Sequence, residues 1–232
     1  MSAPFYVSPE QVMADKAEYA RKGVSRGKSS ITLEFADGVL IMAENTSSLS
    51  KIGEIYDRIA FAGVGKFSEF DQLRKVGVRY ADMKGYQYSR DDVRARALAN
   101  AYSQAMGDVF TRELKPLEVE VIVVEVGDPE LIGHENNAIY RVQFDGSISD
   151  HEDYCVIGGA AEELTGYMRS HYKKDLPLGE ALQLGRAALQ RASDVQIAVP
   201  PENLEVCALE KTRIGRKFRR LPTEELTEHL SS

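Results

Sequence analysis

The stretch from Asp37 to Lys66 constrains the fold of this chain more than any other. After an Asp-Gly pair typical of a hairpin turn, it continues with a short apolar β segment, Val39 to Ala43. A polar loop with Glu44 and Lys51 follows, and Tyr56 to Gly63 has the pattern of another strand. Short β segments joined by short connections favour antiparallel pairing, because parallel strands need long crossovers.

Helical and strand patterns alternate in blocks along the rest of the chain. Ser8, Pro9 and Gln11 predict a helix start, with Ser8 as cap and Gln11 completing a capping box. This helix is expected to run to about Arg21 or Lys22 and to stop near Gly23. The other predicted strands are Ile31 to Phe35, Val119 to Val126, Ile139 to Phe144, Tyr154 to Ile157, Leu204 to Leu209 and Lys217 to Leu221. Two predicted helices carry core-facing stripes, one at Phe67, Phe70, Leu73 and Val76 and the next at Leu98, Ala101, Tyr102, Ala105 and Val109. Two more predicted helices span Ala161 to Lys173 and Leu178 to Ala192.

The order of these blocks is strands, two helices, strands, two helices and strands. It favours an α+β fold in which two stacked antiparallel sheets are covered by helices on both outer sides. A chain of 232 residues can bury a full core as a single domain. We assign that domain to residues 8–222, with a separate segment at 1–7 and a short acidic tail, able to form a helix, at 223–232.

Composition excludes several classes of function. A net charge of −7 argues against broad affinity for nucleic acids or membranes, which require a cationic face. No apolar run approaches the ~20 residues that span a bilayer, and no signal peptide is visible. Cys155 and Cys207 lie in apolar strands, which favours reduced thiols and a cytoplasmic location, with a buried disulfide as the alternative. The four histidines share no metal-ligand spacing and are expected to be solvated, so no metal or cofactor is predicted.

A second motif precedes the Asp37–Lys66 stretch, namely Glu18-Tyr19-Ala20-Arg21 with Gly27 six residues further on. Together the two motifs resemble the α-type subunit of the proteasome core particle, in its actinobacterial form, over nearly the whole chain. The resemblance implies the four-layer αββα sandwich of the proteasome and N-terminal-nucleophile hydrolase family. It also implies a choice, because that scaffold occurs both as a peptidase and as a non-catalytic subunit.

The residue that would make this chain a peptidase is missing. Catalytic members of the family use an amino-terminal threonine whose own amine serves as base. Aligned with that pattern, Glu44 and Lys51 fall where the two helper residues belong, but the nucleophile position falls at Lys28, directly after Gly27. Without the family, Glu44 and Lys51 have the simpler interpretation of a solvated acid and a solvated lysine. Ser29 is the alternative nucleophile, and it would require an unusual cleavage before it.

The resemblance also implies a pocket between neighbouring subunits that receives the carboxyl-terminal tail of a ring-shaped ATPase. A lysine suits this task, because a chain terminus carries a carboxylate and a charge-assisted hydrogen bond contributes roughly 1.5–3 kcal/mol. Glycines suit it too, because without a Cβ they let a peptide backbone approach closely. On residues alone, an exposed lysine and ordinary turn glycines are the simpler interpretation. The family pattern places Lys51, Gly27, Gly65, Arg21 and Lys66 in the pocket.

Two further segments match family elements near the axial pore. The first is an apolar amino-terminal segment, whose counterparts converge on the axis and block the pore. The second is the loop from Thr111 to Glu118, whose Lys115 and Pro116 match a loop that narrows the channel; as a plain helix-to-strand connection it would look the same. The expected gate residues are Ser2, Ala3, Pro4, Phe5, Tyr6 and Val7.

The predicted function is therefore that of a non-catalytic α subunit of a bacterial proteasome core. Its expected partners are itself in a heptameric ring, proteasome β subunits, the ring-shaped ATPase and unfolded protein substrates, including proteins tagged with the small modifier Pup. One alternative is a divergent N-terminal-nucleophile peptidase that uses Ser29. The other is a ring scaffold unrelated to proteolysis.

Overall fold

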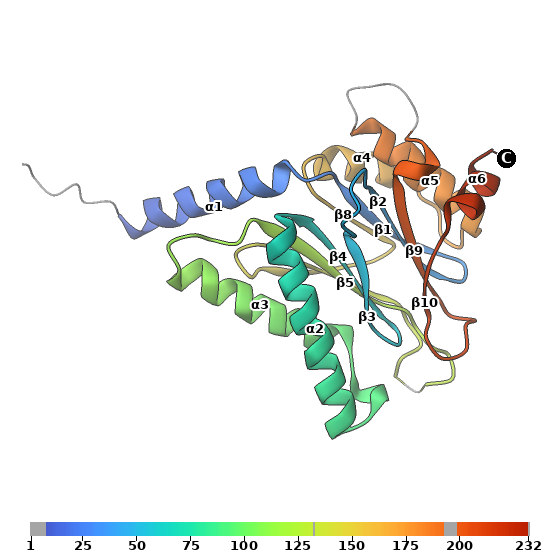
Figure 1. Cartoon of the computed structure of the whole chain (residues 1–232), viewed down its shortest axis with the longest axis horizontal. Helices are drawn as coiled ribbons and strands as arrows, with labels where there is room; N and C mark the ends of the chain where they lie inside the picture. Colours follow the sequence, from blue (N-terminus) through green and yellow to red (C-terminus); the bar gives the residue numbers. More distant parts are fainter. Residues whose placement is uncertain (1–7, 132, 193–198, 232) are drawn as a thin grey trace, which may run out of the picture.

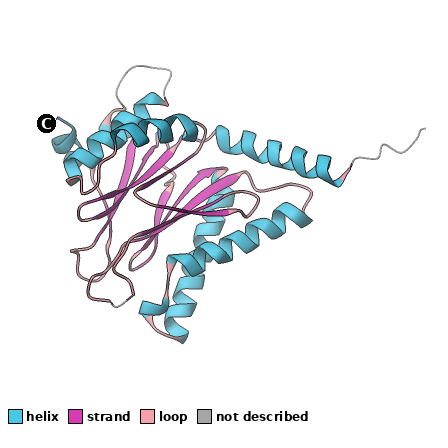
Figure 2. Cartoon of the chain, turned by 180° about the vertical axis from the view of Figure 1, so that it is seen from behind, coloured by secondary structure: helices cyan, strands magenta, loops and turns pink. Residues whose placement is uncertain are grey.

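Two antiparallel sheets lie face to face in the computed structural model, which describes residues 8–131, 133–192 and 199–231 (Figure 2). The first sheet has the strand order β10-β9-β2-β1-β8, and the second has the order β3-β4-β5-β6-β7. The strands are β1 (Ser30–Phe35), β2 (Gly38–Glu44), β3 (Ile52–Tyr56), β4 (Ile59–Gly65), β5 (Val119–Glu125), β6 (Ala138–Val142), β7 (Ile148–His151), β8 (Tyr154–Ile157), β9 (Leu204–Glu210) and β10 (Phe218–Arg220).

Helices cover the outer faces of both sheets. Figure 1 shows α4 and α5 over the first sheet and α2 and α3 over the second, while α1 extends away from one end of the sandwich. This arrangement confirms the predicted α+β class and the four-layer αββα sandwich. The helices are α1 (Pro9–Ser25), α2 (Phe67–Gln87), α3 (Ala95–Arg112), α4 (Ala161–His171), α5 (Leu178–Arg191) and α6 (Thr223–Ser231).

Three apolar clusters fill the spaces between the four layers. One lies between the sheets and includes Ile41, Ile122 and Cys207. The other two lie between each sheet and its helices, represented by Leu40 on the first sheet and Phe61 on the second. Strands β2 and β5 are therefore buried on both faces, which explains why their sequences are apolar runs rather than alternating patterns.

Helix α1 starts as predicted but ends later. Ser8 Oγ accepts a hydrogen bond from the backbone N–H of Gln11 at 3.2 Å, so the cap is confirmed. The Gln11 side chain bonds Asp15 instead of closing a capping box. The predicted stop at Gly23 is wrong, because the helix continues to Ser25. Gly23 serves packing instead, since a Cβ there would lie 2.5 Å from the side chain of Glu118.

The predictions of strands and core positions also need correction. The single strand from Tyr56 to Gly63 is in fact the junction of β3 and β4, which turn at residues 57–58 and pair antiparallel. Val76 is 50% exposed rather than in the core, because α2 approaches α3 at Gly77, where a Cβ would lie 1.8 Å from the Tyr102 hydroxyl. Strand β7 was not predicted; it is a short, partly exposed edge strand without an apolar pattern.

Both cysteines are buried free thiols, so the disulfide alternative is wrong. Cys155 pairs with Thr32 across β8 and β1, whereas Cys207 pairs with Ile41 across β9 and β2, so two strands separate them. Burial raises the pKa of each thiol to about 12, which makes both unreactive at neutral pH.

Candidate functional site

The predicted junction at residues 27–30 lies between the end of α1 and the start of β1. A Cβ on Gly27 would lie 2.5 Å from the Val64 side chain and 2.9 Å from the Gly65 nitrogen, so the junction packs against the end of β4. Ser29 is 4% exposed, and its Oγ accepts a hydrogen bond from the backbone N–H of Ala160 at 3.2 Å. The Ser29 hydroxyl is therefore engaged within the fold.

Lys28, Glu44 and Lys51 lie together beside this junction. The Nζ atom of Lys51 donates hydrogen bonds to the backbone carbonyls of Lys28 at 3.2 Å and of Glu44 at 3.0 Å. The side chain of Lys28 is 57% exposed, and its Nζ atom forms an ion pair with Glu44 Oε1 at 3.1 Å. A solvated, ion-paired lysine thus stands at the position where the family pattern would place a nucleophile.

The amine of Lys51 is a partly desolvated cation whose direct partners are neutral. Burial lowers its pKa, and the nearby carboxylates of Glu205 and Glu44 oppose that change. Within the described residues its hydrogen-bond acceptors are the two carbonyls, so one of the three ammonium hydrogens remains available. An incoming carboxylate could pair with this amine without displacing an internal acid.

Gly65 and Lys66 form the turn from β4 into α2. Gly65 has a φ of 112°, and a Cβ there would lie 2.0 Å from the carbonyl oxygen of Glu118, so the position requires glycine. Lys66 donates its backbone N–H to the same carbonyl at 2.9 Å, and its Nζ atom lies 3.3 Å from Glu69 Oε1. Of the predicted pocket residues, Gly65 therefore meets Gly27 directly, while the amine of Lys66 is engaged by the first turn of α2.

Lys115, predicted in the pore loop, forms an ion pair with Glu69, the same carboxylate that pairs with Lys66. Its Nζ atom lies 2.9 Å from Glu69 Oε1 and 2.9 Å from Glu118 Oε1, and 5.8 Å from the ring centroid of Tyr19. Burial favours the neutral amine, but the hydrogen bonds to Glu118 and Glu69 raise the pKa of Lys115 well above its usual value. Sequence reasoning missed both acids; the only signal was Glu69 in the first helical turn, three residues after Lys66.

The loop that carries Lys115 borders a shallow cavity of about 390 Å³ against α1. Leu114, at the outer side of this loop, is 96% exposed. The lining residues are Asp15, Lys16, Tyr19, Leu114, Lys115 and Pro116. The salt bridges of Lys115 thus tie this loop, with its exposed Leu114, to the first turn of α2.

Arg21 does not meet Lys51 but lies over the ring of Phe144, with its Cζ atom 5.8 Å from the centroid. It lines a cavity of about 240 Å³ together with Gly158 and Gly159. This cavity adjoins the junction, because the backbone N–H of Gly159 donates to the Gly27 carbonyl at 3.4 Å. The structure therefore divides the five predicted pocket residues between the junction, the α2 turn and this separate cavity.

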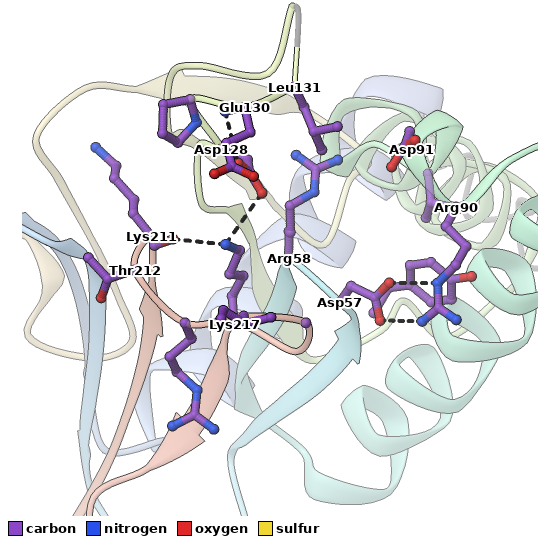
Figure 3. Close-up of a pocket in the computed structure, with 16 residues that line it drawn as sticks. Asp57, Arg58, Arg90, Asp91, Asp128, Glu130, Leu131, Lys211, Thr212 and Lys217 are labelled. Carbon is purple, nitrogen blue, oxygen red and sulfur yellow. Dashed lines mark hydrogen bonds and ion pairs between the residues drawn. The ribbon is translucent and has the colours of Figure 1, made fainter.

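A further cavity of about 440 Å³ lies where the β3–β4 turn, the 128–131 loop and the β9–β10 hairpin meet (Figure 3). Four of its charged side chains form two ion pairs: Arg90 with Asp57 at 2.6 Å, and Lys217 with Asp128 at 3.3 Å. None of the predicted site residues that the structure describes lines it.

His134, next to this cavity, corrects the expectation of solvated histidines. Its Nδ1 atom lies 2.8 Å from Arg58 Nη2 and 3.4 Å from Glu125 Oε1, and Arg58 and Glu125 are both buried. Residues 126–137 connect β5 to β6, and the contact with Glu125 ties His134, within this connection, to the end of β5.

The gate segment from Ser2 to Val7 lies outside the described residues. Within the described residues, no group of three or more histidine, cysteine or acidic side chains is arranged to hold a metal ion. Each helix in the described part of the chain is too short or too polar to cross a bilayer.

Comparison with known proteins gives consistent matches. The family model described as proteasome subunit matches residues 24–209. The proteasome subunit alpha of Acidothermus cellulolyticus is 50% identical over 234 residues, which cover 99% of this chain and 98% of the relative. Proteins of the same name from Thermobifida fusca and Streptomyces coelicolor are 48% and 49% identical, with 99% and 100% of this chain and 91% of each relative covered.

Proposed function

The chain belongs to the proteasome subunit family as an α-type member, and we propose that it is a non-catalytic ring subunit that docks a ring-shaped ATPase and gates substrate entry. Seven copies form each outer ring of a cytoplasmic core, next to rings of β subunits. The substrates are unfolded proteins, including those tagged with Pup. The observation that carries the docking role is the Lys51 amine, a partly desolvated cation bound by neutral carbonyls at a junction that lacks a nucleophile.

The non-catalytic role is supported by the junction at residues 27–30. An amino-terminal nucleophile needs a free amine beside an accessible hydroxyl. Here Ser29 is buried and its hydroxyl bonds the backbone at Ala160, while the exposed residue before it is the ion-paired Lys28. A cut before Ser29 would have to open a packed backbone to expose the new amine.

The purified chain alone should therefore hydrolyse no fluorogenic peptide, and its intact mass should show no cut before Ser29. Peptide turnover assayed in a host that lacks its own proteasome checks this expectation. Activity that disappears in the Ser29→Ala variant would support a divergent peptidase. Failure to copurify with a β-type peptidase would instead favour a ring scaffold unrelated to proteolysis.

The docking role rests on the chemistry of a chain terminus. The tail of an ATPase ends in a carboxylate, and Lys51 offers it a cation with one free donor. Gly27 and Gly65 lie in contact at the same junction, and Val64 and the Glu118 carbonyl fill the space of their missing Cβ atoms, so the two glycines set the close backbone packing next to Lys28, whose carbonyl binds Lys51. Lys66 is held by Glu69 at the α2 turn, and Arg21 lines the separate cavity that adjoins the junction, so their proposed contribution is positive charge around the site rather than contact with Lys51.

The gating role rests on the composition of residues 2–7, which contain Phe5, Tyr6 and Val7. Seven copies of such a segment near one axis can close a narrow opening through apolar contacts. Deleting residues 2–7 should raise peptide hydrolysis by the assembled core, while the cap of α1 at Ser8 stays in place. Rates of the truncated and full-length cores should be compared at equal active-site concentration.

The gain should appear as faster entry of both a small peptide and an unfolded protein, with the same cleavage sites. Equal rates for the two cores on both substrates would mean that residues 2–7 do not form the gate. In that case the loop with Lys115 and Pro116 becomes the candidate constriction.

A further inference from the structure

The loop of residues 45–51 carries the chain from the first sheet to the second and ends at Lys51. It leaves β2, which belongs to the first sheet, and enters β3, which belongs to the second. The position of the Lys51 amine therefore depends on how this loop is held. Within the loop, Asn45 Nδ2 donates to the Leu49 carbonyl at 2.8 Å, and Asn45 Oδ1 accepts from the Ser47 N–H at 3.0 Å.

One carboxylate, that of Glu205 on β9, holds both ends of this loop. At the start of the loop, Glu205 Oε2 accepts a hydrogen bond from Asn45 Nδ2 at 2.8 Å. At its end, the same oxygen accepts from the backbone N–H of Lys51 at 2.8 Å, and Oε1 accepts from the N–H of Ile52 at 3.1 Å. The side chain of Glu205 is only 10% exposed. Hydrogen bonds to a charged, shielded acceptor are stronger than those between neutral groups.

Arg220 on β10 completes the network. Its Nη1 atom donates to Glu205 Oε1 at 2.8 Å, and its Nη2 atom donates to the Ile52 carbonyl at 2.5 Å. The arginine thus compensates the buried charge of Glu205 and bonds the backbone at the start of β3. Because β9 and β10 pair within the first sheet, the loop is anchored to a rigid element.

We propose that Glu205 is the positioning residue of the tail-docking site, holding the 45–51 loop so that the Lys51 amine is preorganised for a terminal carboxylate. This inference rests on the proposed docking function. Without Glu205, the two ends of the loop lose their shared acceptor, and binding a tail must then include the cost of ordering the loop. Glu205 also supports the charge of Lys51, because its carboxylate opposes the lowering of the pKa of Lys51 by burial.

The test is the Glu205→Gln variant in the core assembled with its β partner. The probe is a fluorescent ten-residue peptide from the carboxyl terminus of the ATPase, with the same peptide amidated at its end as a second probe. We expect the variant to bind the free-acid peptide roughly tenfold more weakly, because preorganisation is lost. As the pH is raised, the Lys51 amine loses its proton and binding is lost. In the variant this loss should occur at a lower pH than in the wild-type core, because the pKa of Lys51 drops further once the neighbouring acid is neutral.

Glu210→Gln is the matched control. Glu210 lies on the same strand and pairs with an arginine of β10, Arg219, at 2.7 Å, but within the described residues its side chain forms no hydrogen bond or ion pair with the 45–51 loop. This variant should bind the tail peptide with wild-type affinity and pH dependence. If Glu205→Gln prevents assembly, Asn45→Ala is the second variant, because it removes one partner of Glu205 and leaves the acid in place.

Hydrogen exchange of the backbone provides a measurement that does not depend on the tail. Exchange at Lys51 and Ile52 should accelerate in Glu205→Gln and stay unchanged in Glu210→Gln. Wild-type binding and pH dependence in Glu205→Gln, or unchanged exchange, would overturn the inference about Glu205. A wild-type core that binds the acid and the amide equally would instead overturn the docking function, so the two failures are distinguishable.

Discussion

Replacing Lys51 with alanine should abolish stimulation of the core by its ATPase while leaving the particle assembled. The variant removes the cation that the terminal carboxylate of the tail would pair with, and a desolvated charge-assisted hydrogen bond contributes roughly 1.5–3 kcal/mol per site. A ring of several such sites multiplies the loss. The measurement is ATPase-dependent degradation of a tagged protein, with hydrolysis of a small peptide as the readout of an intact core.

Lys28→Ala is the matched control for this prediction. Lys28 lies beside Lys51 and carries the same charge, but its amine pairs with Glu44 at 3.1 Å and its side chain is largely exposed. Because the Lys28 end of this ion pair is largely exposed, the pair contributes little, and Lys28→Ala should retain most of the stimulation. Wild-type stimulation in Lys51→Ala would show that Lys51 does not bind the tail. Equal losses in both variants would mean that the general charge of the surface, rather than one amine, attracts the ATPase.

Gly65→Ala should destabilise the subunit strongly. The residue has a φ of 112°, and the new Cβ would lie 2.0 Å from the Glu118 carbonyl oxygen. Backbone strain of this kind costs on the order of 1–3 kcal/mol, and relief of the clash adds to it, so we expect a loss of about 3 kcal/mol or more. The turn from β4 to α2 would shift, and with it the contact between Gly65 and Gly27. Thermal unfolding of the purified chain and its assembly with the β partner measure the effect.

Gly215→Ala separates the two causes of that loss. Gly215 also has a positive φ, of 76°, but no atom lies within 4 Å of a Cβ built there. The control therefore carries the conformational cost without the clash, and we expect a loss of roughly 1 kcal/mol. If both variants unfold at the same temperature, the close packing at Gly65 contributes nothing to stability, and the close approach of the Glu118 carbonyl has no energetic role.

The sequence predicted correctly those structural features that depend mainly on residues close together in the chain. The Ser8 cap, the hairpin at Gly38 and the buried runs of β2 and β5 follow from capping, turn geometry and apolar content. The helix end near Gly23 and the strand across Tyr56 were wrong for different reasons. At Gly23 the distant Glu118 packs against the helix, whereas at residues 57–58 the chain makes a tight turn without glycine or proline, and β3 folds back onto β4.

The candidate site divides in the same way. The resemblance singled out Lys51, Gly27 and Gly65, and the structure brings them to one junction. It did not single out Glu69, Glu118 or Glu205, because an acid in a strand, a loop or a first helical turn has no distinctive spacing. Their importance comes from the lysines and backbone groups that long-range folding brings to them.

The sequence by itself therefore determined the class of fold, the family and the absence of a threonine at Lys28, since each depends on residue identity or on local periodicity. Only the tertiary structure decided the electrostatics of the site. It buried the Ser29 hydroxyl and gave the Lys51 amine two carbonyl partners. It also brought the Glu205 carboxylate into hydrogen-bond contact with both ends of the 45–51 loop. Burial and hydrogen bonding are properties of neighbours far apart in the chain, so they exist only once the two sheets have packed together.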